Sequence, residues 1–358
     1  MEFQTFTLSN GIRVIHKQDT TTNVSHCGLI INVGSRDEDE HEQGVAHYIE
    51  HSFFKGTQKR KAFHILSRLA AVGGELNAYT TKEETCIYAS FLKEHYERSV
   101  ELISDIVFNS TYPAKEIEKE KAVIIDEIDS YLDSPSEQIF DDFEDLVFAN
   151  HSLGKNILGT KESVQSFKQQ HIKDFIKKNY ATDKMVFSSI GNTAYYEKHK
   201  NKGTLYLLNN LLGGPEMNTR LNLSIREKYG YTYNLESNYQ PYSDTGIFSI
   251  YMGTDSKYLN KTISLVEKEL KKLRETKLGI RQLKEAKQQL IGYATLAEEG
   301  KCNKMLSVGK TLLNFNKIED MDSIYKKLNA ITAEQILEVA NQIFEPSKLS
   351  YLVYRSEG

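Results

Sequence analysis

Residues 47–51 read His47-Tyr48-Ile49-Glu50-His51, inside a segment, 44–54, whose apolar residues recur at helical spacing. At about 100° per residue, the two histidines lie about 40° apart on one face of the predicted helix, one turn from each other. Two imidazoles placed in this way can bind one tetrahedral metal ion. Glu50 shares their face, so its carboxylate can reach a metal-bound water as a general base without being a ligand.

A catalytic metal needs a third protein ligand, and the acidic helical segment 116–133 offers candidates. Glu120 and Glu127 are seven residues apart, about two helical turns, so they share one face. The apolar residues Val123, Ile124 and Ile128 lie on or beside that face. Most carboxylates on helices are simply solvated. A carboxylate beside buried apolar residues needs a partner, however, which makes these two the candidates.

Strand and helix patterns surround the motif on both sides. Asn10-Gly11 between two period-two runs predicts a hairpin turn, and Gly73-Gly74 ends a predicted helix. A break follows at Gly191-Asn192. The predicted strands before it are 3–8, 12–16, 24–33, 75–80, 85–92 and 184–190, and the predicted helices are 44–54, 61–72, 95–108, 114–132, 136–148 and 172–180.

The second half of the chain repeats this order of strands, helices and a last strand. Its predicted elements are a helix over 205–212, strands over 231–239 and 246–253, four helices across 257–343 and a strand over 349–354. The repeat predicts an α+β fold with two similar domains, 1–192 and 193–358. Each would hold a mixed, mostly antiparallel sheet with helices packed on one face.

Composition excludes several classes of protein. The chain is 39% apolar and 26% charged, which is ordinary for a soluble globular protein. A net charge of −4 without a basic stripe argues against a nucleic-acid binder, and no apolar run is long enough to span a membrane. Three widely spaced cysteines and no visible secretory signal favour the cytoplasm, although a removed presequence is also compatible.

The stretch 47–57, His-Tyr-Ile-Glu-His-Ser-Phe-Phe-Lys-Gly-Thr, followed by Glu127, resembles the inverzincin metallopeptidases, peptidase family M16. This family includes pitrilysin, insulin-degrading enzyme and mitochondrial processing peptidase, and the chain is similar to its short two-domain bacterial members. Four further segments carry the resemblance: 7–14, 73–81, 211–221 and 225–233.

The resemblance implies a role for each matching residue around one zinc ion per chain. His47, His51 and Glu127 match the zinc ligands, and Glu50 matches the catalytic base. Glu120 matches a second acidic residue that orients a ligand.

The resemblance also implies two substrate-binding elements. Arg226 and Tyr233 match a pair from the second domain that stabilises the oxyanion or grips the substrate backbone. Asn77, Ala78 and Tyr79 match an edge strand that takes an extended peptide as an added strand. From the sequence alone, these residues would be read as a surface charge, a strand aromatic and a surface strand.

The chain departs from the family pattern after Gly191-Asn192, where a strand-helix piece of some tens of residues is missing. Either the protein has lost it or the printed sequence omits it. A loss would expose the sheet of the second domain, which favours the second explanation. The zinc motif is untouched in either case.

The sequence therefore predicts a zinc endopeptidase that cleaves peptides or unfolded segments. Members of this family form a chamber from four domains, so a chain with two domains implies a homodimer or a heterodimer with a related subunit. A non-catalytic partner subunit is one alternative, although such subunits lose the zinc motif. A structural zinc protein is another, but structural sites use four protein ligands, usually with Cys.

Overall fold

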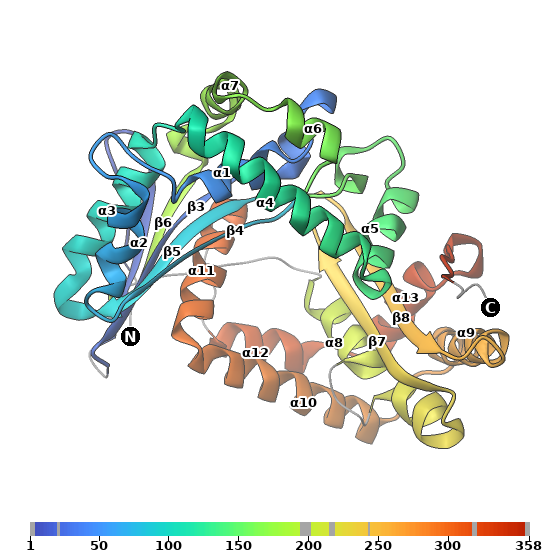
Figure 1. The fold of residues 1–358 in the computed structure, drawn as a ribbon. Helices are drawn as coiled ribbons and strands as arrows, with labels where there is room; N and C mark the ends of the chain where they lie inside the picture. The colour runs from blue at the N-terminus through green and yellow to red at the C-terminus, as the bar shows by residue number, and fades with distance from the viewer. Residues whose placement is uncertain are drawn as a thin grey trace. The chain divides into compact units, whose positions relative to one another are not determined.

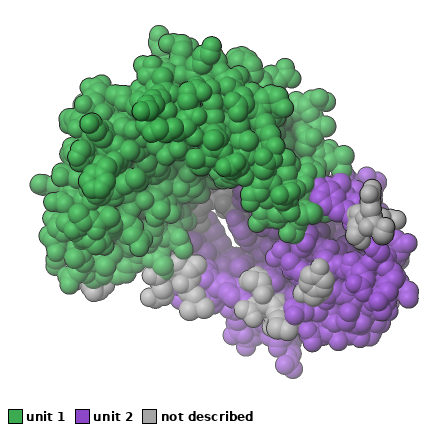
Figure 2. All heavy atoms as spheres, viewed as in Figure 1, with its two compact units in different colours: residues 1–198, 300–318 green, residues 199–299, 319–358 purple. Residues whose placement is uncertain are grey.

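The computed structural model describes residues 4–19, 22–193, 202–214, 219–242, 244–316 and 321–354. The chain forms two compact units (Figure 2). The first is Met1–Lys198 with Gly300–Ile318, and the second is His199–Glu299 with Glu319–Gly358. Helices and a mixed sheet confirm the predicted α+β class.

The first unit is built on a six-stranded sheet with the order β1-β2-β6-β3-β5-β4 (Figure 1). Its ladders are antiparallel except for β2 with β6, which is parallel. The predicted Asn10-Gly11 turn joins the first two strands, with Gly11 at a φ of +97°. The strands are β1 (Gln4–Thr7), β2 (Arg13–Gln18), β3 (Val24–Ile31), β4 (Glu75–Thr80), β5 (Thr85–Leu92) and β6 (Met185–Thr193).

Seven helices are described between the strands, and all of them except α5 supply residues to the main core of this unit. In β3, the alternate residues Cys27, Leu29 and Ile31 face these helices and are buried in that core. The helices are α1 (Val45–Ser52), α2 (Ala62–Ala70), α3 (Tyr96–Asn109), α4 (Ala114–Leu132), α5 (Pro135–Val147), α6 (Lys161–Ser166) and α7 (Gln169–Asn179).

The opposite face of the same sheet is covered by α11 (Lys301–Phe315). Ile30 points to this face and packs with Leu312 and Leu313. At Gly309 the contact is so close that an added Cβ would lie 2.3 Å from the Ile30 side chain and 2.8 Å from Ser188 Cβ. The predicted domain boundary at residue 192 differs from this division into units. It would assign α11 to the second domain and leave this apolar face of the sheet uncovered.

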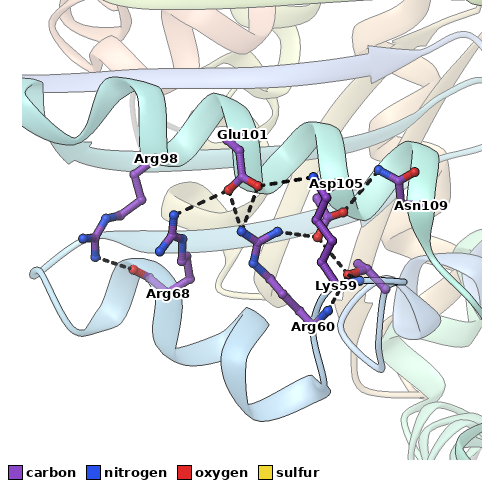
Figure 3. Close-up of polar contacts among 8 residues, drawn as sticks. Lys59, Arg60, Arg68, Arg98, Glu101, Asp105 and Asn109 are labelled. Carbon is purple, nitrogen blue, oxygen red and sulfur yellow. Dashed lines mark hydrogen bonds and ion pairs between the residues drawn. The ribbon is translucent and has the colours of Figure 1, made fainter.

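A network of charges holds the segment after α1 against α3 (Figure 3). The Arg60 guanidinium bonds both carboxylate oxygens of Glu101, at 2.8 and 2.7 Å, and also contacts Asp105. The hydroxyl of Thr57 donates to the same Asp105 carboxylate at 2.8 Å. Because Asp105 is almost fully buried, these donors are what make its charge tolerable.

The second unit, described by itself, has a two-stranded antiparallel sheet of β7 (Thr232–Pro241) and β8 (Gly246–Thr254). Its core gathers leucines from α8, α9 and β7 with Ile336 of α13 and Phe344, the residue after that helix. The span 257–343 holds five described helices rather than the predicted four, and one of them is α11. The helices of the second unit are α8 (Lys202–Gly213), α9 (Leu259–Glu275), α10 (Ile280–Glu299), α12 (Met321–Ala330) and α13 (Ala333–Ile343).

The predicted strand over 349–354 is wrong, since these residues have no strand assignment in the structure. In the first unit the last strand, β6, pairs with β2 and β3, which precede the first helix. In the described residues between 202 and 354 the only strands are β7 and β8, which pair with each other, so a strand over 349–354 has no described equivalents of β2 and β3 beside it. None of the described helices is both long and apolar enough to cross a membrane.

Candidate metal centre

Helix α1 is positioned by the residues before it. Gly44 precedes the helix at a φ of +88°, and an added Cβ there would lie 2.5 Å from the carbonyl oxygen of Leu158. Buried Glu38 accepts hydrogen bonds from the backbone N–H groups of Gly44, at 2.8 Å, and Ala46, at 2.9 Å. Burial raises the pKa of Glu38 to about 8, and these two donors oppose that rise.

The helix places His47 and His51 side by side, with ring centroids 4.6 Å apart and planes at 68°. His47 is buried, and burial together with the neighbouring His51 lowers its pKa to about 3. The ring of His47 is therefore neutral at physiological pH, which is the form that binds metal ions. Tyr48, between them, donates its hydroxyl hydrogen to the carbonyl of Ile117 and so ties α1 to the start of α4.

Glu127, from α4, faces both imidazoles. Its Oε1 lies 3.7 Å from Nε2 of His47, and its Oε2 lies 3.4 Å from Nε2 of His51. One ligand atom from each of these residues lies within 4.8 Å of the others. Two ligands of a tetrahedral zinc ion, with bonds of about 2.0–2.2 Å, lie about 3.3–3.5 Å apart. The three side chains thus fit one zinc ion, and the structure brings together the three predicted ligands.

Glu120 fixes the orientation of His51 from the other side of its ring. Its Oε2 lies 3.2 Å from Nδ1 of His51, and its Oε1 lies 2.7 Å from Nζ of Lys55. A carboxylate accepts a hydrogen bond from Nδ1–H, which leaves the lone pair of Nε2 directed at Glu127. This tautomer is the one that a metal at the three-residue group requires.

Glu50 lies on the same helix, half-buried, and is not one of the three grouped ligands. Burial raises its pKa, while nearby Thr80 and His51 act in the opposite direction. Thr80 is the last residue of β4, the strand at the edge of the sheet. The carboxylate of Glu50 therefore lies near both His51 and this edge strand.

Two family models match the chain. Residues 13–161 match Insulinase (Peptidase family M16), and residues 193–290 match the Peptidase M16 inactive domain. The uncharacterized zinc protease YmxG of Bacillus subtilis is 31% identical, and the alignment covers 95% of this chain and 95% of that protein. The chain belongs to peptidase family M16.

Two further proteins are similar to this chain over nearly its whole length. An uncharacterized zinc protease of Rickettsia felis is 31% identical over 97% of this chain and 96% of its own. The crystal structure of a protease from Helicobacter pylori has the same fold, with a TM-score of 0.87 and 18% identity over 97% of this chain and 98% of that one. The alignment with YmxG spans 389 positions, more than the 358 residues here, so the relative has residues without a counterpart in this M16 chain.

The predicted edge strand is β4, which in the described residues pairs only with β5. Asn77, Ala78 and Tyr79 all lie on it. Ala78 packs into the main core, whereas Tyr79 points to the α11 side, where its hydroxyl donates to Glu84 at 3.1 Å. The side chain of Tyr79 is thus engaged within the unit, and what the strand offers a peptide is its outer backbone edge.

Arg226 and Tyr233 belong to the second unit. Arg226 lies half-buried in a π-helical turn, Asn222–Glu227, and its carbonyl accepts a hydrogen bond from Gly230 at 2.8 Å. Tyr233 is in β7 by its backbone, but its side chain lies outside the described residues. Both residues thus belong to the second unit, whereas the histidine site belongs to the first.

Three residues at the site were not predicted from the sequence. Lys55 lies four positions after His51, and this spacing could have suggested it as a partner for Glu120. Thr80 directly follows the predicted edge-strand residues. Glu38 caps α1 from outside the helix, and because its contact is made by loop geometry, helical periodicity gives no signal for it.

Proposed function

We propose that this chain is a zinc-dependent endopeptidase that hydrolyses peptides or unfolded polypeptide segments. The observation that supports it most is the group of three candidate ligands, His47, His51 and Glu127. Glu50 lies on the same helix as the histidines but is not one of the ligands. Three protein ligands leave one position of a tetrahedral ion open for chemistry, as in catalytic rather than structural zinc sites. The names of the Bacillus and Rickettsia relatives point to the same activity.

Zinc bound at this group would polarise the scissile carbonyl and make water a stronger nucleophile. Glu120 and Lys55 hold His51 in the tautomer that leaves its Nε2 free. Glu50 takes the proton of the attacking water and later passes it to the leaving amine. Its partial burial keeps the carboxylate away from competing bulk water.

The substrate lies along β4 as an added antiparallel or parallel strand in this proposal. Backbone hydrogen bonds would hold it with little demand on sequence, and folded proteins, which present no free strand, would be excluded. Arg226 and Tyr233 stabilise the oxyanion or grip the substrate backbone. They come from the partner chain of a dimer, homodimeric or with a related subunit.

A non-catalytic subunit is the second candidate, because the model that matches residues 193–290 is that of an inactive domain. That match concerns the second half of the chain, whereas all three candidate ligands lie in the first. A purified chain that binds one equivalent of zinc and cleaves nothing would favour this candidate.

The test compares wild type with Glu50→Gln on a quenched library of mixed peptides, with zinc content measured on both. The proposal expects equal zinc and a loss of cleavage of at least about 100-fold, since general-base catalysis contributes about 10²–10⁴-fold. Unchanged cleavage by the variant would rule out the assigned role of Glu50.

A further inference from the structure

A concave site lies in the second unit, between the tyrosines that follow Arg226 and one face of α9. It has a volume of about 490 Å³. We call it the tyrosine–lysine groove; Tyr229 and Tyr231 form its wall, and its floor includes Lys261, Ser264, Leu265 and Lys268. The four floor residues recur at helical spacing, so they form a continuous stripe of α9.

The two tyrosine rings of the wall belong to a stack of three rings, which also includes Tyr258. Tyr229 stacks on Tyr231 with centroids 5.3 Å apart, and Tyr231 stacks on Tyr258 at 4.4 Å. Lysine ammonium groups cap both ends: Lys228 lies 5.2 Å from the ring centre of Tyr229, and Lys257 lies 4.9 Å from that of Tyr258. Since its ends are capped and its inner faces are used, the stack offers ring edges rather than a free face to a nucleotide base.

The floor is positively charged without internal compensation. Among the residues that the structure describes, neither Lys261 nor Lys268 forms an ion pair. Two acids of α9 are engaged elsewhere: Glu269 pairs with Lys272 and with Arg220, and Glu267 accepts a hydrogen bond from Tyr351. The groove thus presents two uncompensated ammonium groups beside an aromatic wall, although the whole chain carries a net charge of −4.

The spacing of the two lysines suits an extended peptide. They are seven residues apart on α9, which is about 10.5 Å along a helix at 1.5 Å per residue. In a polyproline II peptide, which has three residues per turn, side chains three positions apart point to the same side and lie about 9 Å apart at 3.1 Å per residue. Two carboxylates separated by two residues can therefore meet both ammonium groups at once.

We propose that the tyrosine–lysine groove binds an acidic segment of a peptide substrate, with carboxylates at Lys261 and Lys268 and apolar atoms against Tyr229 and Leu265. The wall lies between Arg226 and Tyr233 in sequence, in the segment assigned above to substrate binding. The inference rests on the proposed function for the identity of its ligand as a substrate, but the binding itself does not depend on cleavage.

The test measures the binding of a fluorescent peptide with a Glu-x-x-Glu motif, and of its Gln-x-x-Gln counterpart, to the full chain carrying Glu50→Gln. Fluorescence anisotropy gives the Kd without turnover. The variant Lys261→Gln/Lys268→Gln is compared with Lys271→Gln/Lys284→Gln, which removes the same charge from α9 and α10 outside the groove. Matching thermal unfolding curves establish that both variants fold.

The groove variant is expected to bind the acidic peptide about fivefold more weakly, as two exposed ion pairs at about 0.5 kcal/mol each imply. The control variant stays within about twofold, and the Gln peptide binds all proteins alike. Equal losses in both variants, or a loss in neither, overturn the proposal. So does an oligonucleotide that binds wild type as tightly as the acidic peptide and through the same lysines.

The two proposals fail separately in this experiment. Lysine-dependent binding by the Glu50→Gln chain, together with a zinc-loaded chain that retains Glu50 and cleaves no peptide, leaves the groove in place and contradicts the endopeptidase. Peptide cleavage together with binding that ignores Lys261 and Lys268 contradicts the groove alone.

Discussion

At the scale of single residues, the candidate centre depends on pairs in which one side chain fixes the state of another. Glu120 is buried, yet its two oxygens are shared between His51 and Lys55, so its charge is compensated. Its action on the metal is indirect, because it sets which nitrogen of His51 carries the proton.

Glu120→Gln should weaken zinc binding by about tenfold or more, since an amide oxygen accepts the hydrogen bond from Nδ1–H of His51 less strongly than a carboxylate. A chelating dye in competition with the protein measures the affinity. Glu118→Gln, on the exposed side of the same helix and paired only with Lys121 among the contacts described, is the control and should leave the affinity unchanged. Equal affinities of all three proteins would show that Glu120 does not position the ligand.

Asp105 gives a prediction for the pH dependence of stability. Burial acts to raise its pKa, but the hydrogen bonds from Thr57 and Arg60 outweigh it, and the pKa is lowered. A lowered pKa adds stability above the unfolded value of about 4, and this stability is lost as pH falls through the folded pKa. Asp105→Asn should cost about 2 kcal/mol at pH 7.

The difference between Asp105→Asn and wild type should shrink below about pH 4, as the native carboxylate becomes protonated. Urea unfolding of the first unit at several pH values measures it. A difference that stays constant down to pH 3 would mean that the charge of Asp105 contributes nothing to stability.

At the scale of elements, much of the first unit could be predicted from local signals. The predicted bounds of β4, β5 and α4 coincide with the observed ones, because alternation, helical period and the glycine breaks are all encoded within a few residues. Pairing is not local. The strand predicted over 349–354 has the right residue types, but a strand exists only beside a partner.

The same limit explains α11. Its sequence predicts a helix, but nothing within it says that Gly309 will pack against Ile30, almost three hundred positions earlier. In the centre, helical period put Glu120 and Glu127 on one face, whereas the distances to the histidines depend on how α1 packs against α4. Periodicity could suggest Lys55, and it could not suggest Glu38 or Thr80.

Gly309→Ala tests the packing of α11 on the sheet. The added methyl group overlaps Ile30 and Ser188, so the variant should lose about 1–3 kcal/mol of stability. Gly292→Ala is the matched control within α10, where nothing lies within 4 Å, and it should be neutral or stabilising by up to about 1 kcal/mol. Thermal unfolding of both variants distinguishes them, and a stabilised Gly309→Ala would contradict the close contact.

At the scale of the whole molecule, the proposal that Arg226 acts on the site of a partner chain can be tested by mixing two inactive variants. Glu50→Gln and Arg226→Ala, exchanged into mixed dimers, leave one site with both residues intact when the pair acts between chains. Half of the dimers are mixed in an equal mixture, so about a quarter of wild-type activity should return. No recovery after verified exchange would place both residues in the same chain's site or exclude a dimer.

The most direct measurement is a zinc titration of the chelated chain, followed by cleavage of a quenched peptide. His47, His51 and Glu127 predict that activity is absent without metal, rises in proportion to added zinc and levels off at about one zinc per chain. Cleavage that survives complete removal of the metal, or one bound zinc per chain with no cleavage of any peptide, would contradict the assignment as a zinc endopeptidase.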